Sequence, residues 1–433
     1  MTSGRSVAPP HLSQLGAHVD ASARTFLREL FNAAVAAADP ARVLADCLPE
    51  LPTGSCVVVG AGKASAAMAA AVEAAWPDIA ITGCVVVPYG YALPCRQIRV
   101  LEAGHPVPDA NSVIAAQAML AQVSGLGPDD LVLALISGGG SSTLCLPAAG
   151  LTLADKQVTN QLLLRSGLDI RTMNAVRRRI SRIKGGRLAA AARPARVLTL
   201  AVSDIPGDDA SAIASGPTVA DATAQLDLRD AVNCLGPALP AAVRDLLLRP
   251  SPALLIDSEP VRIIASASGS LSAAADLVRE AGLEPVILGD AIEGEAREVA
   301  QAMAAQALTA RVPTVFLSGG ETTVTGGSGD AGRGGRNTEF LLALVSALDR
   351  RAGIWAIAAD TDGADGANQG AAGAIAGPDT LPRAAALGID AAASLAGHDS
   401  GTFFAALGDL VTTGPTCTNV NDFRAILVIP QQR

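Results

Sequence analysis

Short, almost continuous apolar runs alternate with alanine-rich stretches along this chain. Runs such as 56–60, 131–137 and 195–203 are typical of strands, and stretches such as 63–76 and 152–192 are typical of helices. A strand that is apolar at every position is buried on both faces, as in a parallel sheet with helices on each side. The pattern therefore predicts an α/β fold with a Rossmann-like parallel sheet.

The same alternation restarts after a proline-rich segment at residues 249–260. The later strands are expected at 261–268, 284–289, 313–320, 354–360 and 424–429. We interpret the proline-rich segment as the linker or its edge, and a length of 433 residues suits two or three domains. We therefore predict an N-terminal Rossmann-like domain over 1–250 and a second α/β domain over 251–433.

Composition narrows the class of protein. The net charge of −9 argues against a general nucleic-acid binder or a protein of anionic membrane surfaces. No run reaches the roughly 18 apolar residues of a spanning helix, and the polar segment 1–20 does not resemble a signal peptide. Seven cysteines without a CxxC pair indicate reduced thiols. We expect a cytoplasmic protein with small-molecule partners, and a homo-oligomer is compatible with these data.

The first glycine-rich motif follows the run 56–60. Gly60 and Gly62 permit a tight turn, and Lys63 stands at the start of the next helix, whose N–H groups suit an anion. The motif is not a P-loop, because Ala64 replaces the hydroxyl residue, and Ser65 replaces the third glycine of a dinucleotide fingerprint. We predict an anion site, with a plain strand–helix turn as the alternative.

A second glycine-rich motif follows the run 131–137. Its backbone and hydroxyl groups could wrap phosphate oxygens, although a flexible turn is the alternative. We expect nucleotide binding by Gly60 and Gly62 together with Ser137, Gly138, Gly139, Gly140, Ser141 and Ser142.

Clustered carboxylates follow the run 195–203. Asp204, Asp208 and Asp209 offer the oxygen ligands that Mg²⁺ prefers. A turn that caps the next helix is an equally good interpretation. We expect Asp204 and Asp208 to be the metal ligands if the first interpretation holds.

Two charged motifs lie in the second predicted domain. Arg333 and Arg336 are embedded in glycine, where a guanidinium could grip a phosphate or carboxylate; a solvated loop is the alternative. The motif 360–366 is rich in aspartate and could hold a metal or position a hydroxyl. It is not an EF-hand, because Ala371 stands where the bidentate glutamate is required.

Weaker signals lie elsewhere. The segment 171–187, called the basic stretch below, holds seven basic residues. It is either a solvated helix face or a local positive field for a polyanion. His105, in Gly-His-Pro, is either an acid–base group or, more simply, a structural loop residue.

Nine ordered motifs together make a specific signature. The chain resembles the glycerate 2-kinases of the MOFRL family (class II glycerate kinases) from about Phe26 to Val428. The matching segments are VVVGAGKASAAMA, EAGHPVPDANS, LISGGGSSTLCLP, MNAVRRRISRIKGGRLA, SDIPGDDASAIASGPT, LSGGETTVT, GRGGRNTEF, DTDGADG and GDLVTTGPTCTNVNDFRAILV. Where many relatives read AGTDGTDG, this chain has Asp360.

The resemblance implies phosphorylation of D-glycerate at C2 by ATP, with Mg²⁺, in a cleft between two α/β domains. It implies roles for Lys63 and Arg336, one on the phosphoryl group and one on the glycerate carboxylate. Asn337 is expected to help bind the substrate, and Asp362 to orient the attacking hydroxyl. The alternatives are an NAD(P)H-dependent hydroxypyruvate reductase, which would need a full GxGxxG, and a binding protein without turnover.

Overall fold

The computed structural model describes residues 19–251, 254, 256, 258–325, 332–366 and 370–430. They form two compact units. Of the described residues, the N-terminal unit comprises those within Asp39–Ala265 and Cys417–Asn419, and the C-terminal unit comprises those within 19–38, Ser266–Thr416 and 420–430. Each unit has its own six-stranded sheet and helices, which confirms the predicted fold of two α/β domains.

The sheet of the N-terminal unit is parallel throughout, with the strand order β3-β2-β1-β4-β5-β6. Its strands are β1 (Cys56–Ala61), β2 (Ile81–Pro88), β3 (Arg99–Ala103), β4 (Leu131–Ile136), β5 (Arg196–Val202) and β6 (Arg262–Ala265). This is the order of the Rossmann fold, and the direction of winding reverses between β1 and β4. Ligands of such sheets bind beyond the carboxyl ends of the strands at that reversal.

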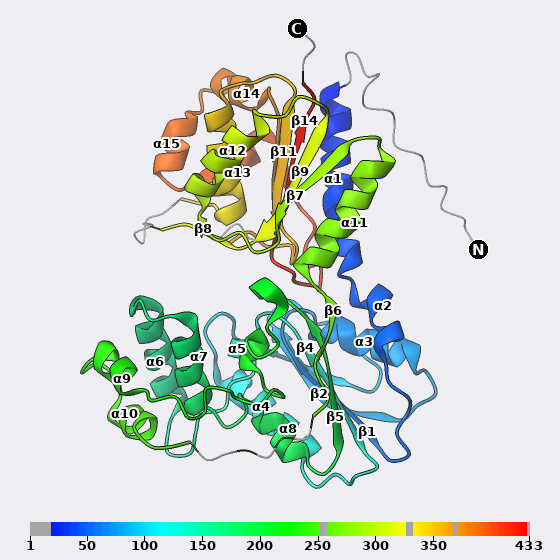
Figure 1. Cartoon of the computed structure of the whole chain (residues 1–433), viewed down its shortest axis with the longest axis vertical. Helices are drawn as coiled ribbons and strands as arrows, with labels where there is room; N and C mark the ends of the chain where they lie inside the picture. Colours follow the sequence, from blue (N-terminus) through cyan, green and yellow to red (C-terminus); the bar gives the residue numbers. More distant parts are fainter. Residues whose placement is uncertain are drawn as a thin grey trace. The chain divides into compact units, whose positions relative to one another are not determined.

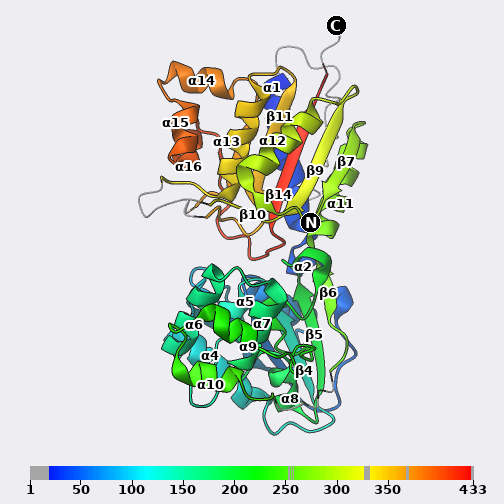
Figure 2. The same ribbon diagram turned by 60° about the vertical axis from the view of Figure 1, so that its left-hand side comes forward.

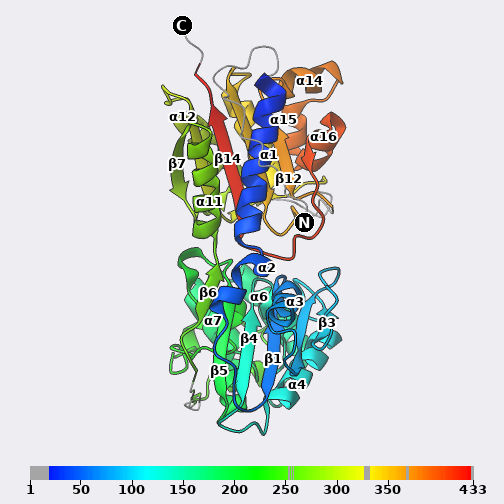
Figure 3. The same cartoon turned by 90° about the vertical axis from the view of Figure 1, so that its right-hand side faces the viewer.

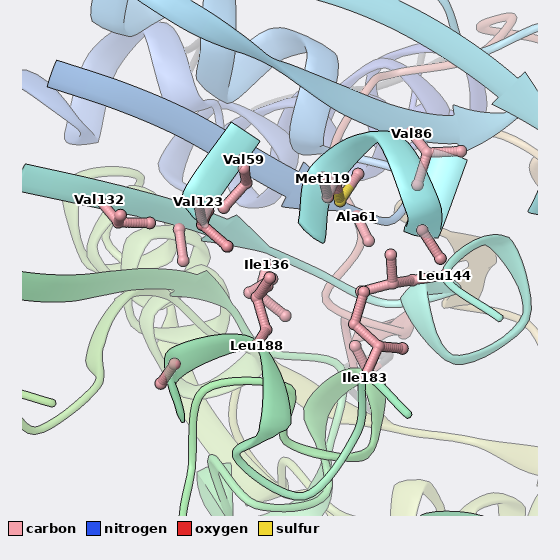
Figure 4. Close-up of a cluster of buried hydrophobic side chains, with 14 of the residues drawn as sticks. Val59, Ala61, Val86, Met119, Val123, Val132, Ile136, Leu144, Ile183 and Leu188 are labelled. Carbon is pink, nitrogen blue, oxygen red and sulfur yellow. The ribbon is translucent and has the colours of Figure 1, made fainter. Parts of the chain in front are cut away.

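Helices cover both faces of this sheet. The helices of this unit are α2 (Pro40–Val43), α3 (Ser65–Ala75), α4 (Ala110–Val123), α5 (Gly140–Thr143), α6 (Leu153–Arg165), α7 (Ile170–Arg179), α8 (Arg187–Ala192), α9 (Arg229–Leu235) and α10 (Ala241–Leu247). Val59 and Ile136 of the sheet pack with Met119 of α4 and Leu188 of α8 (Figure 4). Helices α6, α7, α9 and α10 gather around a smaller core of their own (Figures 1 and 2).

The C-terminal unit has a mixed sheet of order β13-β12-β11-β14-β9-β7. Its strands are β7 (Glu284–Gly289), β9 (Thr314–Gly320), β11 (Ile354–Asp360), β12 (Gly373–Ala376), β13 (Leu410–Val411) and β14 (Asp422–Val428). The central strand β14 is antiparallel to both of its neighbours, β11 and β9. The short strands β8 (Gly294–Glu295) and β10 (Thr322–Thr323) pair separately.

Two layers of helices enclose this second sheet (Figure 1). One layer is α1 (Val19–Ala37) with α11 (Ala267–Glu280), which lie beside each other in Figure 3. The other is α12 (Ala296–Ala307), α13 (Arg336–Leu348), α14 (Thr380–Ala386), α15 (Ala391–Ala396) and α16 (Ser400–Leu407). None of the helices within the described ranges is both long enough and apolar enough to cross a bilayer.

The division into units differs from the predicted boundary after residue 250 at two places. Helix α1 belongs to the C-terminal unit, because its apolar stripe packs on the second sheet, where Phe31 lies 6.0 Å from Phe423 between ring centroids. Strand β6 belongs to the N-terminal unit, because it pairs with β5 and completes the first sheet. The proline-rich segment therefore precedes the last strand of the first sheet.

Candidate functional site

The loops after β1 and β4 are locked together at the reversal of the parallel sheet. The Lys63 N–H donates to the Gly138 carbonyl at 2.8 Å, and the Ala64 N–H donates to the Ser137 hydroxyl at 2.9 Å. Gly62 has a φ of +122°, and a Cβ there would clash with the Ser137 carbonyl. Lys63 and Ser137, both predicted from the sequence, thus lie close together at the carboxyl ends of neighbouring strands.

Charged and polar side chains lie beside the glycines of the loop after β4. A Cβ on Gly138 would overlap the carboxylate of Asp204, which follows β5. A Cβ on Gly139 would lie 3.4 Å from Cγ of Lys63 and 3.2 Å from Cδ2 of His105. The glycines therefore allow a lysine, a carboxylate and a histidine to approach one stretch of backbone.

Two members of this group were not singled out as site residues from the sequence. His105 follows β3, and the motif Gly-His-Pro left a structural role as the simpler interpretation. Asn419 comes from the distant segment before β14, and its side-chain amide lies 3.3 Å from Oδ2 of Asp204. The signal for Asn419 was only its place in the last matching motif, because no local pattern links residues 215 positions apart.

The other carboxylates of the loop after β5 have separate surroundings. Asp209 accepts hydrogen bonds from the Ser211 N–H at 2.9 Å and the Ser211 hydroxyl at 3.1 Å, as a turn-capping residue does. Asp208 is half-buried and has a φ of +56°. Within the described ranges, no three side chains of histidine, cysteine, aspartate or glutamate gather as a metal site.

The serines of the second loop differ in their contacts. The Ser142 hydroxyl donates to the Gly139 carbonyl at 3.0 Å and closes the first turn of α5. Ser141 is exposed, and its hydroxyl lies 2.9 Å from that of Ser215 and 3.0 Å from Nζ of Lys184. Gly140 is tightly packed, because a Cβ there would lie 2.7 Å from Cβ of Ala214.

In the C-terminal unit, carboxylates hold the guanidinium of Arg336. Nε donates to Asp422 at 2.8 Å, Nη2 donates to Asp360 at 2.8 Å, and Nη1 pairs with Glu321. Burial lowers the pKa of Arg336, but the three carboxylates raise it by more, so its pKa lies above the ordinary value and the guanidinium stays charged. The anion expected opposite Arg336 is thus supplied here by the protein. Asp360 is one of these partners.

The start of α13 explains the position of Asn337. The Asp365 carboxylate accepts the backbone N–H groups of Asn337 and Thr338, both at 2.9 Å, at the positive end of the helix. The Asn337 side chain is fully buried and donates to Asp422 at 2.7 Å. In this structure Asn337 therefore supports the network around Arg336 and does not reach the surface.

Asp362 is also buried. Its carboxylate accepts the Ala364 N–H at 2.8 Å, and its own N–H donates to Asp360 at 3.0 Å. Its carbonyl accepts the Thr416 N–H at 3.1 Å. These bonds hold the aspartate-rich turn against the segment before β14.

The basic stretch is neither a solvated face nor an open positive surface at its two central arginines. Arg178 is buried, lies 3.2 Å from Asp221 and donates to the Ser211 carbonyl at 2.6 Å. Arg179 is buried and donates to the Arg249 carbonyl at 2.6 Å. These cations join α7 to loops of the same unit, which helical spacing alone could not reveal.

Comparisons with known proteins cover most of the chain. Residues 26–248 match a domain of unknown function (DUF4147), and residues 314–422 match the MOFRL family. The chain is 34% identical to a D-glycerate 2-kinase of Thermotoga maritima, over 93% of this chain and 97% of the relative. It is 56% identical to an Agrobacterium vitis protein called "Putative hydroxypyruvate reductase", over 94% of this chain and 95% of the relative.

A solved structure has the same fold. The crystal structure of glycerate kinase from Thermotoga maritima matches with a TM-score of 0.85 and 33% sequence identity. The match covers 94% of this chain and 100% of that chain.

Proposed function

Because the chain belongs to the glycerate 2-kinase family that carries the MOFRL domain, and is a glycerate kinase, we propose that it transfers the γ-phosphoryl group of ATP to the C2 hydroxyl of D-glycerate. The products are 2-phosphoglycerate and ADP. The observation that carries this proposal is the group around Gly138 and Gly139, where Lys63 and Asp204 lie at the carboxyl ends of the strands of a Rossmann-ordered sheet. We place this enzyme in the cytoplasm, as the cysteine pattern of the sequence predicts.

Phosphoryl transfer depends mainly on positioning and on charge neutralisation, and the N-terminal unit provides groups for both. We assign the loop Ser137 to Ser142 to the nucleotide phosphates. Lys63 either neutralises the transferring phosphoryl group or holds the glycerate carboxylate, and Arg336 takes the other role. For Arg336, the exposed Glu321 is the partner that an incoming anion would replace, since Asp360 and Asp422 are buried.

We assign a magnesium ion to the loop after β5. Mg²⁺ keeps several waters and is usually held by one or two carboxylates together with substrate phosphates. Asp204 lies against the glycine loop and is therefore the first ligand we assign, with Asp208 as the second. The ion would neutralise charge on the phosphate oxygens. Asp362 is assigned to orient the C2 hydroxyl, and Asp362→Asn tests that role.

One assay tests the reaction. Purified protein is incubated with D-glycerate, ATP and Mg²⁺, and the product is coupled through enolase and pyruvate kinase without a mutase. Because enolase accepts only the 2-phosphate isomer, NADH oxidation through added lactate dehydrogenase reports 2-phosphoglycerate. Absence of signal with active coupling enzymes would overturn the proposal.

The name of the Agrobacterium vitis relative makes hydroxypyruvate reduction the second candidate. The strand order suits a dinucleotide, but two expected features differ. Ser65 replaces the third glycine of the fingerprint, and its hydroxyl donates to the Leu135 carbonyl at 2.9 Å. Tyr89 and Gly90, with no carboxylate, follow β2 where a ribose-binding acid is expected. Oxidation of NADH by hydroxypyruvate without ATP would favour this candidate.

A further inference from the structure

A buried lysine lies beside an exposed serine in the N-terminal unit. Lys184 is 3% exposed, and its Nζ lies 2.7 Å from the Ser141 carbonyl, 3.0 Å from the Ser141 hydroxyl and 3.4 Å from the Ala214 carbonyl. Within the described ranges, no carboxylate lies within ion-pairing distance of Lys184. A buried ammonium without a counter-ion is costly, so the site favours a neutral amine.

The groups around Lys184 also favour its neutral form. Burial lowers the pKa of Lys184 well below that of an ordinary lysine, and nearby cations lower it further, while one thiol raises it. The charged and titratable groups concerned are Lys156, Cys145, Arg177 and Arg178.

Three acceptors surround Nζ, enough for the three N–H groups of an ammonium, but the lack of a nearby carboxylate in the described part of the chain favours the neutral form. A neutral amine has two N–H donors and one lone pair. In the neutral form the carbonyls of Ser141 and Ala214 keep the two N–H groups, and the lone pair then faces the Ser141 hydroxyl, 3.0 Å away. In this arrangement the Ser141 proton points at a base.

A second serine completes the chain of hydrogen bonds. Ser215 is buried, and its hydroxyl lies 2.9 Å from Oγ of Ser141. With the Ser141 proton directed to Lys184, Ser215 donates to Ser141. Ala214 and Ser215 have φ of +50° and +63°, a conformation that non-glycine residues adopt at a cost and that occurs often at functional sites.

We propose that Ser141 is a nucleophile whose proton is taken by Lys184, and that this site accepts an electrophilic phosphoryl group. With a fluorophosphonate, Oγ of Ser141 forms a bond to phosphorus, the P–F bond breaks, fluoride leaves with the electron pair, and the serine proton moves to Nζ. The pattern of a nucleophile, a base in hydrogen-bond reach and a third group that orients them is that of activated serines. The exposure of Ser141 lets a reagent approach.

The test is covalent labelling of the whole protein with an alkyl fluorophosphonate, followed by intact mass and peptide mapping. We expect one equivalent on Ser141. The rate should rise with pH and level off above the pKa of Lys184, which is lower than that of an ordinary lysine, because only the neutral amine accepts the proton. This readout needs neither ATP nor glycerate, so its failure is distinct from failure of the kinase proposal.

Matched lysine variants identify the base. Lys184→Met should slow labelling by roughly 100-fold or more, as expected for loss of a general base. Lys156→Met is the control, because Lys156 is equally buried but donates to the Ile180 carbonyl at 3.2 Å and not to a serine. Loss of the Lys156 charge raises the pKa of Lys184, so this variant should shift the pH midpoint upwards but keep the wild-type rate on the alkaline plateau.

Ser215→Ala is a second test of the proposal, to be used if Lys184→Met does not fold. It should slow labelling by about fivefold, the effect of one lost hydrogen bond, without shifting the pH midpoint. The proposal is overturned if Ser141 of the wild-type protein reacts no faster than Ser142 at any pH. It is also overturned if folded Lys184→Met labels at the wild-type rate.

Discussion

At the scale of single residues, Lys63 illustrates how backbone contacts can position a functional side chain. Its N–H group bonds to Gly138, and that bond does not depend on the side chain. Lys63→Ala should therefore lower kcat/KM for glycerate phosphorylation by about 100-fold or more, as for loss of one group that stabilises transition-state charge. Its melting temperature should stay close to that of the wild type.

The control for this variant is Arg182→Ala, which removes an exposed positive charge from the same unit. It should retain full activity. If Lys63→Ala keeps more than half of the wild-type kcat/KM, the assignment of this lysine to the reaction is wrong.

Glu73, in the alanine-rich helix α3, stabilises the fold in a way that the sequence did not indicate. Its buried carboxylate accepts the N–H groups of Arg96 at 2.6 Å, Gln97 at 2.7 Å and Ile98 at 2.8 Å. Burial raises the pKa of Glu73, but these bonds lower it more, so its pKa in the folded state lies below the ordinary value. Glu73→Gln should cost about 2 kcal/mol in the free energy of unfolding at neutral pH.

The pH dependence of this difference has a defined sign. The carboxylate contributes its stabilisation fully above the unfolded pKa of about 4.3 and loses it as pH falls through the lower folded pKa. Urea unfolding at several pH values should show the gap between wild type and Glu73→Gln shrinking below about pH 4. The exposed Glu280→Gln serves as the control. A gap that widens in acid would contradict the assignment.

At the scale of elements, buried strands were predictable and their pairing was not. Strand β1 is buried at every position, which the apolar run made clear. Strand β12, of sequence Gly-Ala-Ile-Ala, carries no comparable signal. The run that became β14 gave no hint that this strand is antiparallel to both neighbours, because direction depends on partners far away in the chain.

The same limit applies to the candidate site. The loops bearing Lys63 and Ser137 were predictable, since each follows a recognisable strand. The partners of Arg336 were not. Asp422 lies 86 positions away, and only folding of the second sheet brings its carboxylate to the guanidinium.

The glycine loop after β4 gives a prediction about an element. Gly138→Ala should push Asp204 and Asn419 away, because the added Cβ overlaps the side chains of both. A misplacement of about 1 Å can reduce catalysis by roughly 100-fold, so we expect a fall of 10- to 100-fold in kcat/KM. Steady-state kinetics at several Mg²⁺ concentrations measure it.

Gly269→Ala is the matched control, because it lies in α11 and its Cβ would come no closer than 4.0 Å to the neighbours found there. It should be fully active and slightly more stable, since alanine favours a helix. Wild-type kinetics for Gly138→Ala would show that the position of Asp204 is unimportant for the reaction.

At the scale of the whole molecule, the domain division rests on a contact that no local pattern reveals. Helix α1 has apolar residues at helical spacing, but the sheet they cover begins more than 200 residues later in the chain. The Arg24 guanidinium bonds to Asp379 at 2.7 Å and to Asp409 at 3.1 Å, and the Asp20 carboxylate accepts the indole N–H of Trp355 at 2.7 Å. The C-terminal unit is therefore discontinuous in sequence.

We predict that residues 251–433 alone do not fold stably, whereas residues 19–38 joined by a flexible linker to 266–433 do. Phe26, Leu27, Leu30 and Phe31 of α1 are buried in the core of that unit. Burial of each stabilises by about 1.5–3 kcal/mol, and four such losses rival the roughly 5–15 kcal/mol that stabilises a typical domain. Thermal unfolding followed by circular dichroism, with Trp355 fluorescence as a probe of α1 docking, compares the two fragments.

The control carries Leu27→Asp in the linked fragment, which keeps the length of α1 but places a charge against the sheet. The linked fragment should melt cooperatively, and both the short fragment and the Leu27→Asp control should not. A cooperative transition in 251–433 without α1 would show that the second sheet is stable with one face uncovered by this helix, and would restore the boundary after residue 250.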